Sequence, residues 1–167
     1  KRIIQILKSR FSKKYILPAT FHEELNRQCK LALIPSALIV IFAWLPYIPI
    51  DKNLYPGLPI ILYIRAGLSI FGLAVLFLQF LPFFRNREWV LFLSLGFYLE
   101  LSAAIVTGLT KGDPNYMGGY LFIIMLVIVA PFRFYMSWII VGSSVLTFFI
   151  IGLFNGMSFN SARSRYS

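Results

Sequence analysis

The stretch "LPIILYIRAGLSIFGLAVLFLQFLP", residues 58–82, decides the fold. Its two prolines, Pro59 and Pro82, bracket a run of apolar residues that contains one charged residue, Arg65. A helix needs about 20 apolar residues to cross the hydrocarbon core of a bilayer. The run does not alternate apolar and polar residues, as a strand of a membrane barrel would. It therefore predicts a transmembrane helix with an arginine inside it.

The composition of the whole chain supports a membrane location. Of the 167 residues, 59% are hydrophobic and only 13% are charged. A soluble domain is roughly 45–50% apolar and about 25% charged. The net charge is +10, and the charges lie mostly at the ends of apolar runs. That placement favours anionic lipid headgroups and topology signals as partners and argues against nucleic acid.

Four further apolar segments accompany the first, and breaks rich in proline, glycine and charge separate them. The five segments are 31–48, 58–81, 89–109, 117–131 and 135–154. The breaks "PIDKNLYPG" (49–57), "PFFRNRE" (82–88) and "TKGDPNYMGG" (110–119) read as loops, and the short "PFRF" (131–134) predicts a tight helical hairpin. We therefore expect an all-α fold, a polytopic transmembrane helical bundle with five spans in residues 20–155.

The two ends of the chain differ from the bundle. Residues 1–19 are basic, and Ile3, Leu7, Phe11 and Tyr15 recur every four residues. This pattern predicts an amphipathic juxtamembrane segment on the membrane surface, although a disordered end would also fit. "TFHE" (20–23) forms a capping box, so a helix is expected to start at Thr20 and run into the first span. Residues 156–167 are a polar tail or the start of an outer loop.

The basic residues predict the orientation. With a cytoplasmic N-terminus, that side receives eleven lysines and arginines and the other side four. The positive-inside rule favours this arrangement, in the inner membrane of a bacterial cell. The basic tail would then lie outside after five crossings. We therefore expect a sixth helix in the intact protein, followed by a continuation on the cytoplasmic side.

Two charges lie inside the spans, Arg65 in the second and Glu100 in the third. At about 1.5 Å per residue they lie roughly 10 Å and 13 Å from the outer ends of their helices. An isolated arginine at the centre of a membrane costs about 2.5–3.5 kcal/mol on insertion scales. The matched depth therefore predicts that the two side chains approach each other.

Three interpretations of these charges stay open. The pair could fix the register of two helices, it could form a ligand site near the outer face, or Arg65 could reach the outer headgroups by itself. The candidate ligand site consists of Arg65 and Glu100, with Asp113 and Tyr116 above them in the outer loops.

The order of several segments resembles the membrane-associated sensor (MASE-like) domains of bacterial signalling enzymes. The segments are "FHEELNRQCKLAL" (21–33), "DKNLYP" (51–56), "ILYIRAGL" (61–68), "NYMGGYLFIIML" (115–126) and "FRFYMSW" (132–138). In that family a helical membrane bundle precedes a cytoplasmic nucleotide cyclase, either a diguanylate or an adenylate cyclase. The resemblance implies a sensory role for residues 21–154. It supplies no ligand site. It also assigns no cyclase activity to them, because neither a sixth span nor any catalytic domain is found among these residues.

Three functions can be compared. We expect a sensory and anchoring domain that regulates a cytoplasmic output domain, with membrane lipids, an unknown ligand and a second copy of the chain as partners. The alternative is a fragment of a transporter or channel, although the spans offer few polar residues for a path. A membrane enzyme would need a nucleophile with a base or a metal site. The chain has one histidine, His22, and one cysteine, Cys29, so no metal, cofactor or catalytic group is indicated.

Overall fold

The computed structural model describes residues 21–84, 87–130 and 133–156, and all regular structure within these ranges is helical. The expected juxtamembrane segment 1–19, the capping residue Thr20 and the tail from residue 157 lie outside them. Within these ranges, six α-helices and one 3-10 helix follow one another. They are α2 (Phe21–Phe42), α3 (Tyr47–Leu54), α4 (Pro59–Leu78), η1 (Pro82–Phe84), α5 (Glu88–Leu109), α6 (Pro114–Val129) and α7 (Phe134–Phe154).

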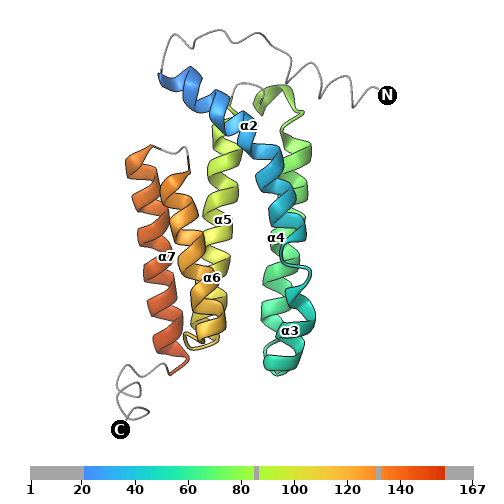
Figure 1. The fold of residues 1–167 in the computed structure, drawn as a ribbon, viewed down its shortest axis with the longest axis vertical. Coiled ribbons are helices and arrows are strands. Elements are labelled where there is room, and N and C mark those ends of the chain that lie inside the picture. Colours follow the sequence, from blue (N-terminus) through green and yellow to red (C-terminus); the bar gives the residue numbers. More distant parts are fainter. Residues whose placement is uncertain (1–20, 85–86, 131–132, 157–167) are drawn as a thin grey trace.

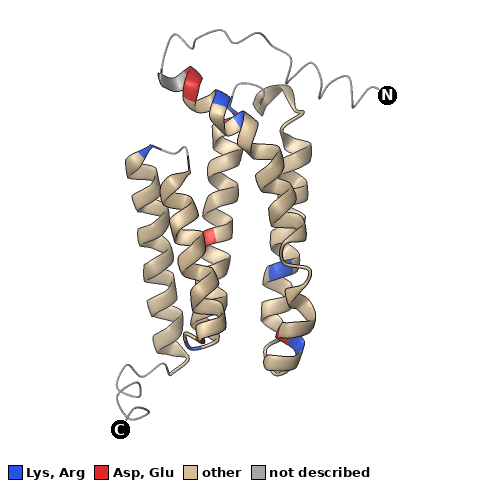
Figure 2. Cartoon of the chain, viewed as in Figure 1, with Lys and Arg blue, Asp and Glu red and all other residues tan. Residues whose placement is uncertain are grey.

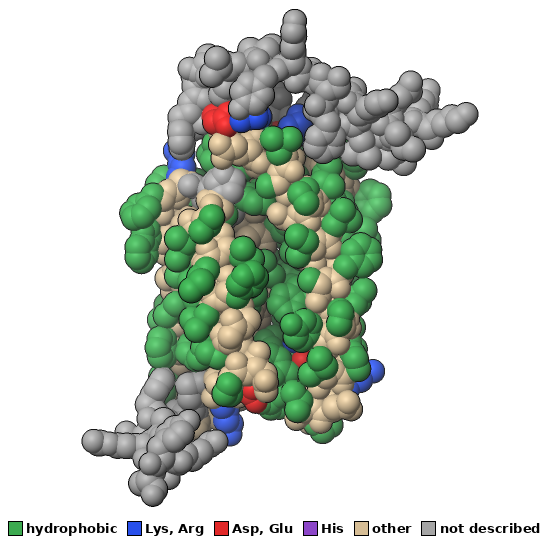
Figure 3. Space-filling model, viewed as in Figure 1, with side chains coloured by type: hydrophobic (Ala, Val, Ile, Leu, Met, Phe, Trp, Pro, Cys, Tyr) green, Lys and Arg blue, Asp and Glu red, His purple; other side chains and the backbone are tan. Residues whose placement is uncertain are grey.

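Four helices, α2, α4, α5 and α7, are long and apolar enough to cross a membrane. The fourth predicted span corresponds to α6, whose 16 residues fall just short of the usual length. The described residues therefore confirm the prediction of a helical fold, with four helices rather than five that are long and apolar enough to cross a membrane. Figure 2 shows charged residues mainly towards the helix ends, and apolar side chains cover much of the face in Figure 3. Phe77, Phe122 and Leu146 are each more than 60% exposed, as expected of side chains that face lipid.

The first span and the first loop differ from the prediction. The expected helix that starts near residue 20 and continues into the first span is present as α2, but it ends at Phe42 and not at residue 48. The segment "PIDKNLYPG" was predicted to be a loop, but most of it belongs to α3. Prolines do not prevent this helix, because Pro46 lies at its N-cap and Pro49 in its first turn. The backbone N–H groups of a first turn have no partner within the helix, so a proline there, which lacks this N–H group, removes no helical hydrogen bond.

The central helix of the molecule is α5. It packs against α2, α4, α6 and α7. Half of its most apolar stretch is buried, compared with 28% in each of the other three long helices. On one side α2, α3 and α4 form a first arm, and on the other α6 and α7 form a second arm (Figure 1). The contact between α6 and α7 confirms the predicted hairpin. The two arms therefore meet chiefly through α5.

Two glycines allow the closest helix crossings. A Cβ atom on Gly72 would lie 3.3 Å from the Ala37 carbonyl oxygen of α2, and one on Gly108 would lie 3.0 Å from Ile151 Cβ of α7. A Cβ on Gly67 would meet only the Tyr98 side chain within 4 Å, and around Gly118 and Gly119 there is open space.

Polar contacts join the helices at the η1 end. Glu88, at the start of α5, is fully buried and forms an ion pair with Lys30 Nζ at 3.3 Å. The amide of Asn26 donates to the Glu88 carboxylate at 3.0 Å and accepts the Trp89 N–H at 3.3 Å. These contacts fasten α2 to α5 and fix the spacing at this end of the first arm.

Candidate functional site

Arg65 forms an ion pair inside the first arm with Asp51 of α3. Its Nη2 donates to Asp51 Oδ1 at 3.0 Å, and its Nε donates to Asp51 Oδ2. The Arg65 and Asp51 side chains are each 5% exposed. A bidentate pair of this kind is the strongest geometry between guanidinium and carboxylate. It neutralises both charges without contact with solvent.

The predicted approach of Arg65 to Glu100 is wrong. No ion pair joins them, because Arg65 is bound by Asp51 and the Glu100 carboxylate bonds to α7 instead. Arg65 and Glu100 lie at a similar counted depth, but depth does not determine which face of its helix each side chain occupies. In addition, Asp51 was expected in a loop, whereas α3 folds back along α4 and places this carboxylate against Arg65.

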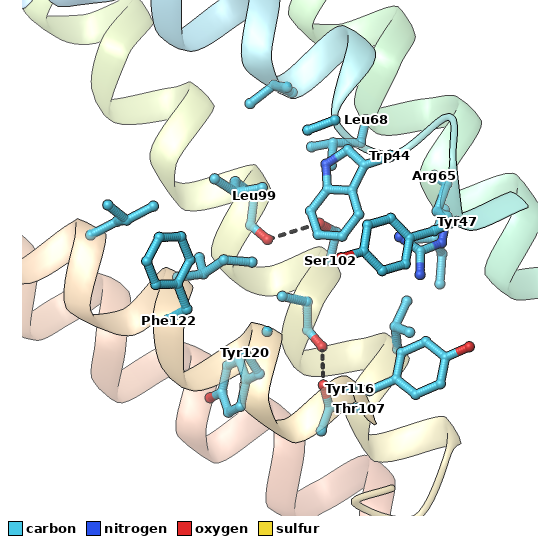
Figure 4. A pocket seen from close by; sticks show the side chains of 18 of the residues that line it. Trp44, Tyr47, Arg65, Leu68, Leu99, Ser102, Thr107, Tyr116, Tyr120 and Phe122 are labelled. Carbon is cyan, nitrogen blue, oxygen red and sulfur yellow. Dashed lines mark hydrogen bonds between the residues drawn. The ribbon is translucent and has the colours of Figure 1, made fainter. Parts of the chain in front are cut away.

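Aromatic rings enclose the ion pair. The Arg65 Cζ atom lies 4.8 Å from the ring centroid of Trp44 and 5.1 Å from that of Tyr47. A guanidinium over an aromatic face is attracted by the negative face of the ring. Figure 4 shows Trp44, Tyr47 and Arg65 side by side. The rings shield the ion pair and so strengthen it, since fewer water molecules screen the charges.

Two hydrogen bonds connect the arms at the α3 end. The Tyr116 hydroxyl of α6 donates to Asp51 Oδ1 at 2.6 Å, and the Tyr55 hydroxyl donates to Asp113 Oδ2 at 2.7 Å. The rings of Tyr55 and Tyr116 also meet edge to face, with centroids 5.7 Å apart. Asp113 additionally caps α6 by accepting the Asn115 N–H at 2.8 Å. We call the two tyrosine–aspartate hydrogen bonds the latch.

The latch alters the acidity of the residues outside the long helices. Burial, and then the hydrogen bond to Asp113, raise the pKa of Tyr55 from 10.0 to about 12. The hydrogen bond from Tyr55 lowers the pKa of Asp113 below its ordinary value. At pH values between the pKa of Asp113 and the pKa of Tyr55, Tyr55 is a hydrogen-bond donor and Asp113 is an anion, as the latch requires.

Glu100 belongs to a second polar cluster, between α5 and the second arm. It is fully buried, and its Oε1 accepts the Ser144 hydroxyl of α7 at 3.1 Å. The Tyr120 hydroxyl lies 2.9 Å from the same Ser144 oxygen. Glu100 Oε2 has no hydrogen-bond partner in the described part of the chain. Of the four predicted site residues, the structure therefore brings together Arg65, Asp113 and Tyr116 and places Glu100 elsewhere.

A cavity of about 330 Å³ lies between the arms, beside the Arg65 pair. Residues of α2 and α4 line one wall, α6 lines the opposite wall, and α5 forms the floor. Figure 4 shows Trp44, Tyr47 and Arg65 on one side of this space and Phe122 on the other, with Leu99 between. The surface in Figure 3 is hollowed between the arms. Its lining is mostly apolar, with the polar groups of Arg65 and Tyr116 towards the α3 end.

Sequence reasoning missed Asp51, Tyr55 and Trp44. A signal was present for Asp51, because it precedes Arg65 by 14 residues and is the nearest acidic residue to it in the chain. Within the described residues, no group of three or more His, Cys, Asp or Glu side chains could hold a metal ion. What the described site provides for a ligand is a set of hydrogen-bonding groups and a cavity.

Comparisons of this chain with protein-family models, with curated protein sequences and with solved structures found no match. The geometry of the site carries the functional argument.

Proposed function

We propose that this chain is a membrane sensory and anchoring domain that regulates a cytoplasmic output domain, such as a nucleotide cyclase. One observation carries the proposal: a cavity separates two arms that share one central helix and are joined across it by the latch. A ligand that enters such a cavity contacts both arms. It can therefore favour one spacing of the arms over another.

The proposed mechanism requires two packings with different ligand affinity. In the packing described here, Tyr116 and Tyr55 hold the arms together at the α3 end. A ligand that lies beside Arg65 and against both walls favours a wider angle between the arms. The movement passes along α2 and α4 to the η1 end, where the Lys30–Glu88 contact ties α2 to α5. With the N-terminus in the cytoplasm, that end faces the output domain.

The sequence supports the same role. The order of segments resembles that of membrane-associated sensor domains, and α2 continues without a break from the charged "FHEELNRQCK" into an apolar helix. Pro35 lies inside this helix and favours a kink, so we expect α2 to pass on tilt about this point.

A transporter or channel fragment receives less support from the contacts. Most of the serine and threonine hydroxyl groups in the spans, which a polar path would need, bond to backbone carbonyls. Ser94, Ser102, Thr107, Ser143 and Thr147 bond within their own helix, and Ser69 bonds to the Ile41 carbonyl of α2. Their donor capacity is consumed locally. The described helices therefore do not offer a line of free polar groups across the bundle.

The test is to fuse the intact protein's membrane region to a cyclase of measurable output. Tyr55→Phe combined with Tyr116→Phe removes both latch hydrogen bonds and keeps the rings. The expected result is a change of several-fold in basal output, because each bond lost shifts the balance by about 0.5–1.5 kcal/mol. Tyr63→Phe is the matched control, since Tyr63 is 69% exposed on α4. Equal output from all three well-folded proteins would leave only an anchoring role.

A further inference from the structure

We infer that the cavity binds one single-chain amphiphile of about ten carbons, with an uncharged head that accepts hydrogen bonds. This inference rests on the proposed function, since it names the ligand class of the same site. The ligand lies between the arms, with its head at the Arg65 pair and its chain against the apolar walls.

The volume sets the size of the ligand. The cavity measures about 330 Å³, at the small end of the roughly 300–1,000 Å³ that ligand pockets occupy. At about 30 Å³ for each water-sized group, it holds roughly eleven non-hydrogen atoms. A bilayer lipid with two long chains is several times larger. One medium-length chain with a small head fills the space.

The lining sets the character of the chain and its route of entry. The walls include Leu68 of α4, Leu99 of α5 and Ile123 of α6, all apolar. Ile39 and Phe122 also line the cavity, from opposite arms, and are 64% and 62% exposed. Residues that both line a cavity and face outward mark its opening. This opening lies on the sides of apolar helices, so the ligand enters from the lipid phase.

The Arg65 pair sets the chemistry of the head. Both Asp51 oxygens already accept hydrogen bonds, Oδ1 from Arg65 Nη2 and Tyr116 and Oδ2 from Arg65 Nε. No hydrogen bond joins Arg65 Nη1 to the part of the chain that the structure describes. Within the charged pair, the group without a hydrogen bond is therefore a donor, and a ligand head that binds to it is an acceptor. A carboxylate head would bring a second negative charge beside Asp51, so an uncharged ketone, ester or amide fits better.

The binding test uses Trp44, which lines the cavity. The full chain is reconstituted in lipid nanodiscs with Trp89→Phe and Trp138→Phe, which leaves Trp44 as the only one of its three tryptophans. The probe is 6-bromo-2-decanone, whose bromine quenches a nearby indole. Quenching of Trp44 should saturate and should be reversed by unbrominated 2-decanone. A matched protein with Trp138 alone, which is 62% exposed on α7, reports simple partition into the bilayer.

A pair of adjacent glycines supplies the matched variants. Gly119 lines the cavity and Gly118 does not, and a Cβ on either would meet nothing within 4 Å. Both glycines are also exposed, so we expect both leucine variants to fold. Gly119→Leu should raise the half-quenching concentration about tenfold or more, because it fills part of the space. Gly118→Leu should leave it unchanged.

The outcomes separate this inference from the proposed function. Non-saturable quenching of Trp44 equal to that of Trp138 would overturn the ligand class, and so would equal effects of the two leucine variants. Competition by decane or decanoate as strong as by 2-decanone would overturn the assignment of the head. Saturable binding with no change in cyclase output would support the ligand class and remove the sensor function. A response of output to the latch variants without quenching of Trp44 would keep the sensor and remove this ligand.

Discussion

At the scale of single residues, Arg65 and Asp51 are each acceptable in their position only because of the other. Both side chains are 5% exposed, and the Trp44 and Tyr47 rings exclude water from the arginine. Removal of one member leaves a buried charge without compensation. Such a charge is far more costly than the pair itself, which contributes little net stability relative to an apolar replacement.

The first prediction is that Arg65→Ala and Asp51→Ala each lower the free energy of unfolding in mixed micelles by about 3–5 kcal/mol. The double substitution should cost clearly less than the sum of the two, because no lone charge remains. Lys52→Ala is the control, since Lys52 is exposed on the same helix as Asp51. Additive effects would show that the two residues are not coupled.

The second prediction concerns the pH dependence of the latch. The pKa of Tyr55 is raised to about 12, so its stabilising effect is complete below pH 10, the value for the unfolded chain, and is lost as the pH rises towards 12. The pKa of Asp113 is lowered, so its effect is complete above its ordinary value of 3.8 and is lost as the pH falls below that value. Unfolding midpoints of the wild type and of Tyr55→Phe should therefore differ most between pH 4 and 10 and converge in stronger alkali. A constant difference up to pH 12 would contradict the assignment.

The residues of the site could be predicted only in part. Arg65, Asp113 and Tyr116 drew attention because a charge in an apolar run and polar groups beside it are visible in the sequence. The partner of Arg65 could not be identified by counting residues from helix ends. Depth is one coordinate, and the face of each helix depends on its packing: Glu100 faces Ser144 of α7, whereas Arg65 faces α3.

At the scale of elements, glycine determines how closely α5 approaches α7. A Cβ on Gly108 would lie 3.0 Å from both Cβ and Cγ2 of Ile151 and 3.2 Å from the Phe148 carbonyl oxygen. These atoms belong to the backbone or to a branched side chain close to it, so they cannot move aside without moving α7.

The third prediction is that Gly108→Ala destabilises the protein. Overpacking costs about 1–3 kcal/mol, and the better helix propensity of alanine returns at most about 1 kcal/mol. Gly142→Ala on α7 should be neutral or stabilising, since a Cβ there meets nothing within 4 Å. Thermal unfolding of both variants in the same detergent measures the difference. A Gly108→Ala protein as stable as the Gly142→Ala protein would show that α7 shifts without cost.

The long helices were predictable because apolar length is read directly from sequence, and α4, α5 and α7 begin and end within a few residues of the expected spans. The short α3 was not predictable in this way. Three prolines within residues 46–56 indicate a turn by local rules. The contacts of α3 with α4, the Arg65 pair among them, supply the tertiary stabilisation that those rules omit.

At the scale of the whole molecule, the contacts place the turn before α4 and the turn before α6 on the same side of the bundle. Tyr55 precedes α4 and Asp113 precedes α6, and their hydrogen bond places both turns at the same end. The fourth prediction is that this end faces outward and the η1 end faces the cytoplasm. In a Cys29→Ser background, an impermeant thiol reagent applied to intact cells should label Lys52→Cys and spare Arg87→Cys. Labelling of the second protein alone would invert the orientation.

The second polar cluster has a consequence for the time course of synthesis. The ribosome adds Glu100 to the chain before its hydrogen-bond partner Ser144, because Ser144 lies 44 residues later. At about 5–20 residues per second, the ribosome needs roughly 2–9 s to make that interval. Glu100 also leaves the ribosome earlier than Ser144 by this interval, so its carboxyl group is without the partner that later holds it for the same length of time. The half-made protein therefore has, for seconds, a carboxyl group that is not yet covered, and α7 covers it when it docks on α5.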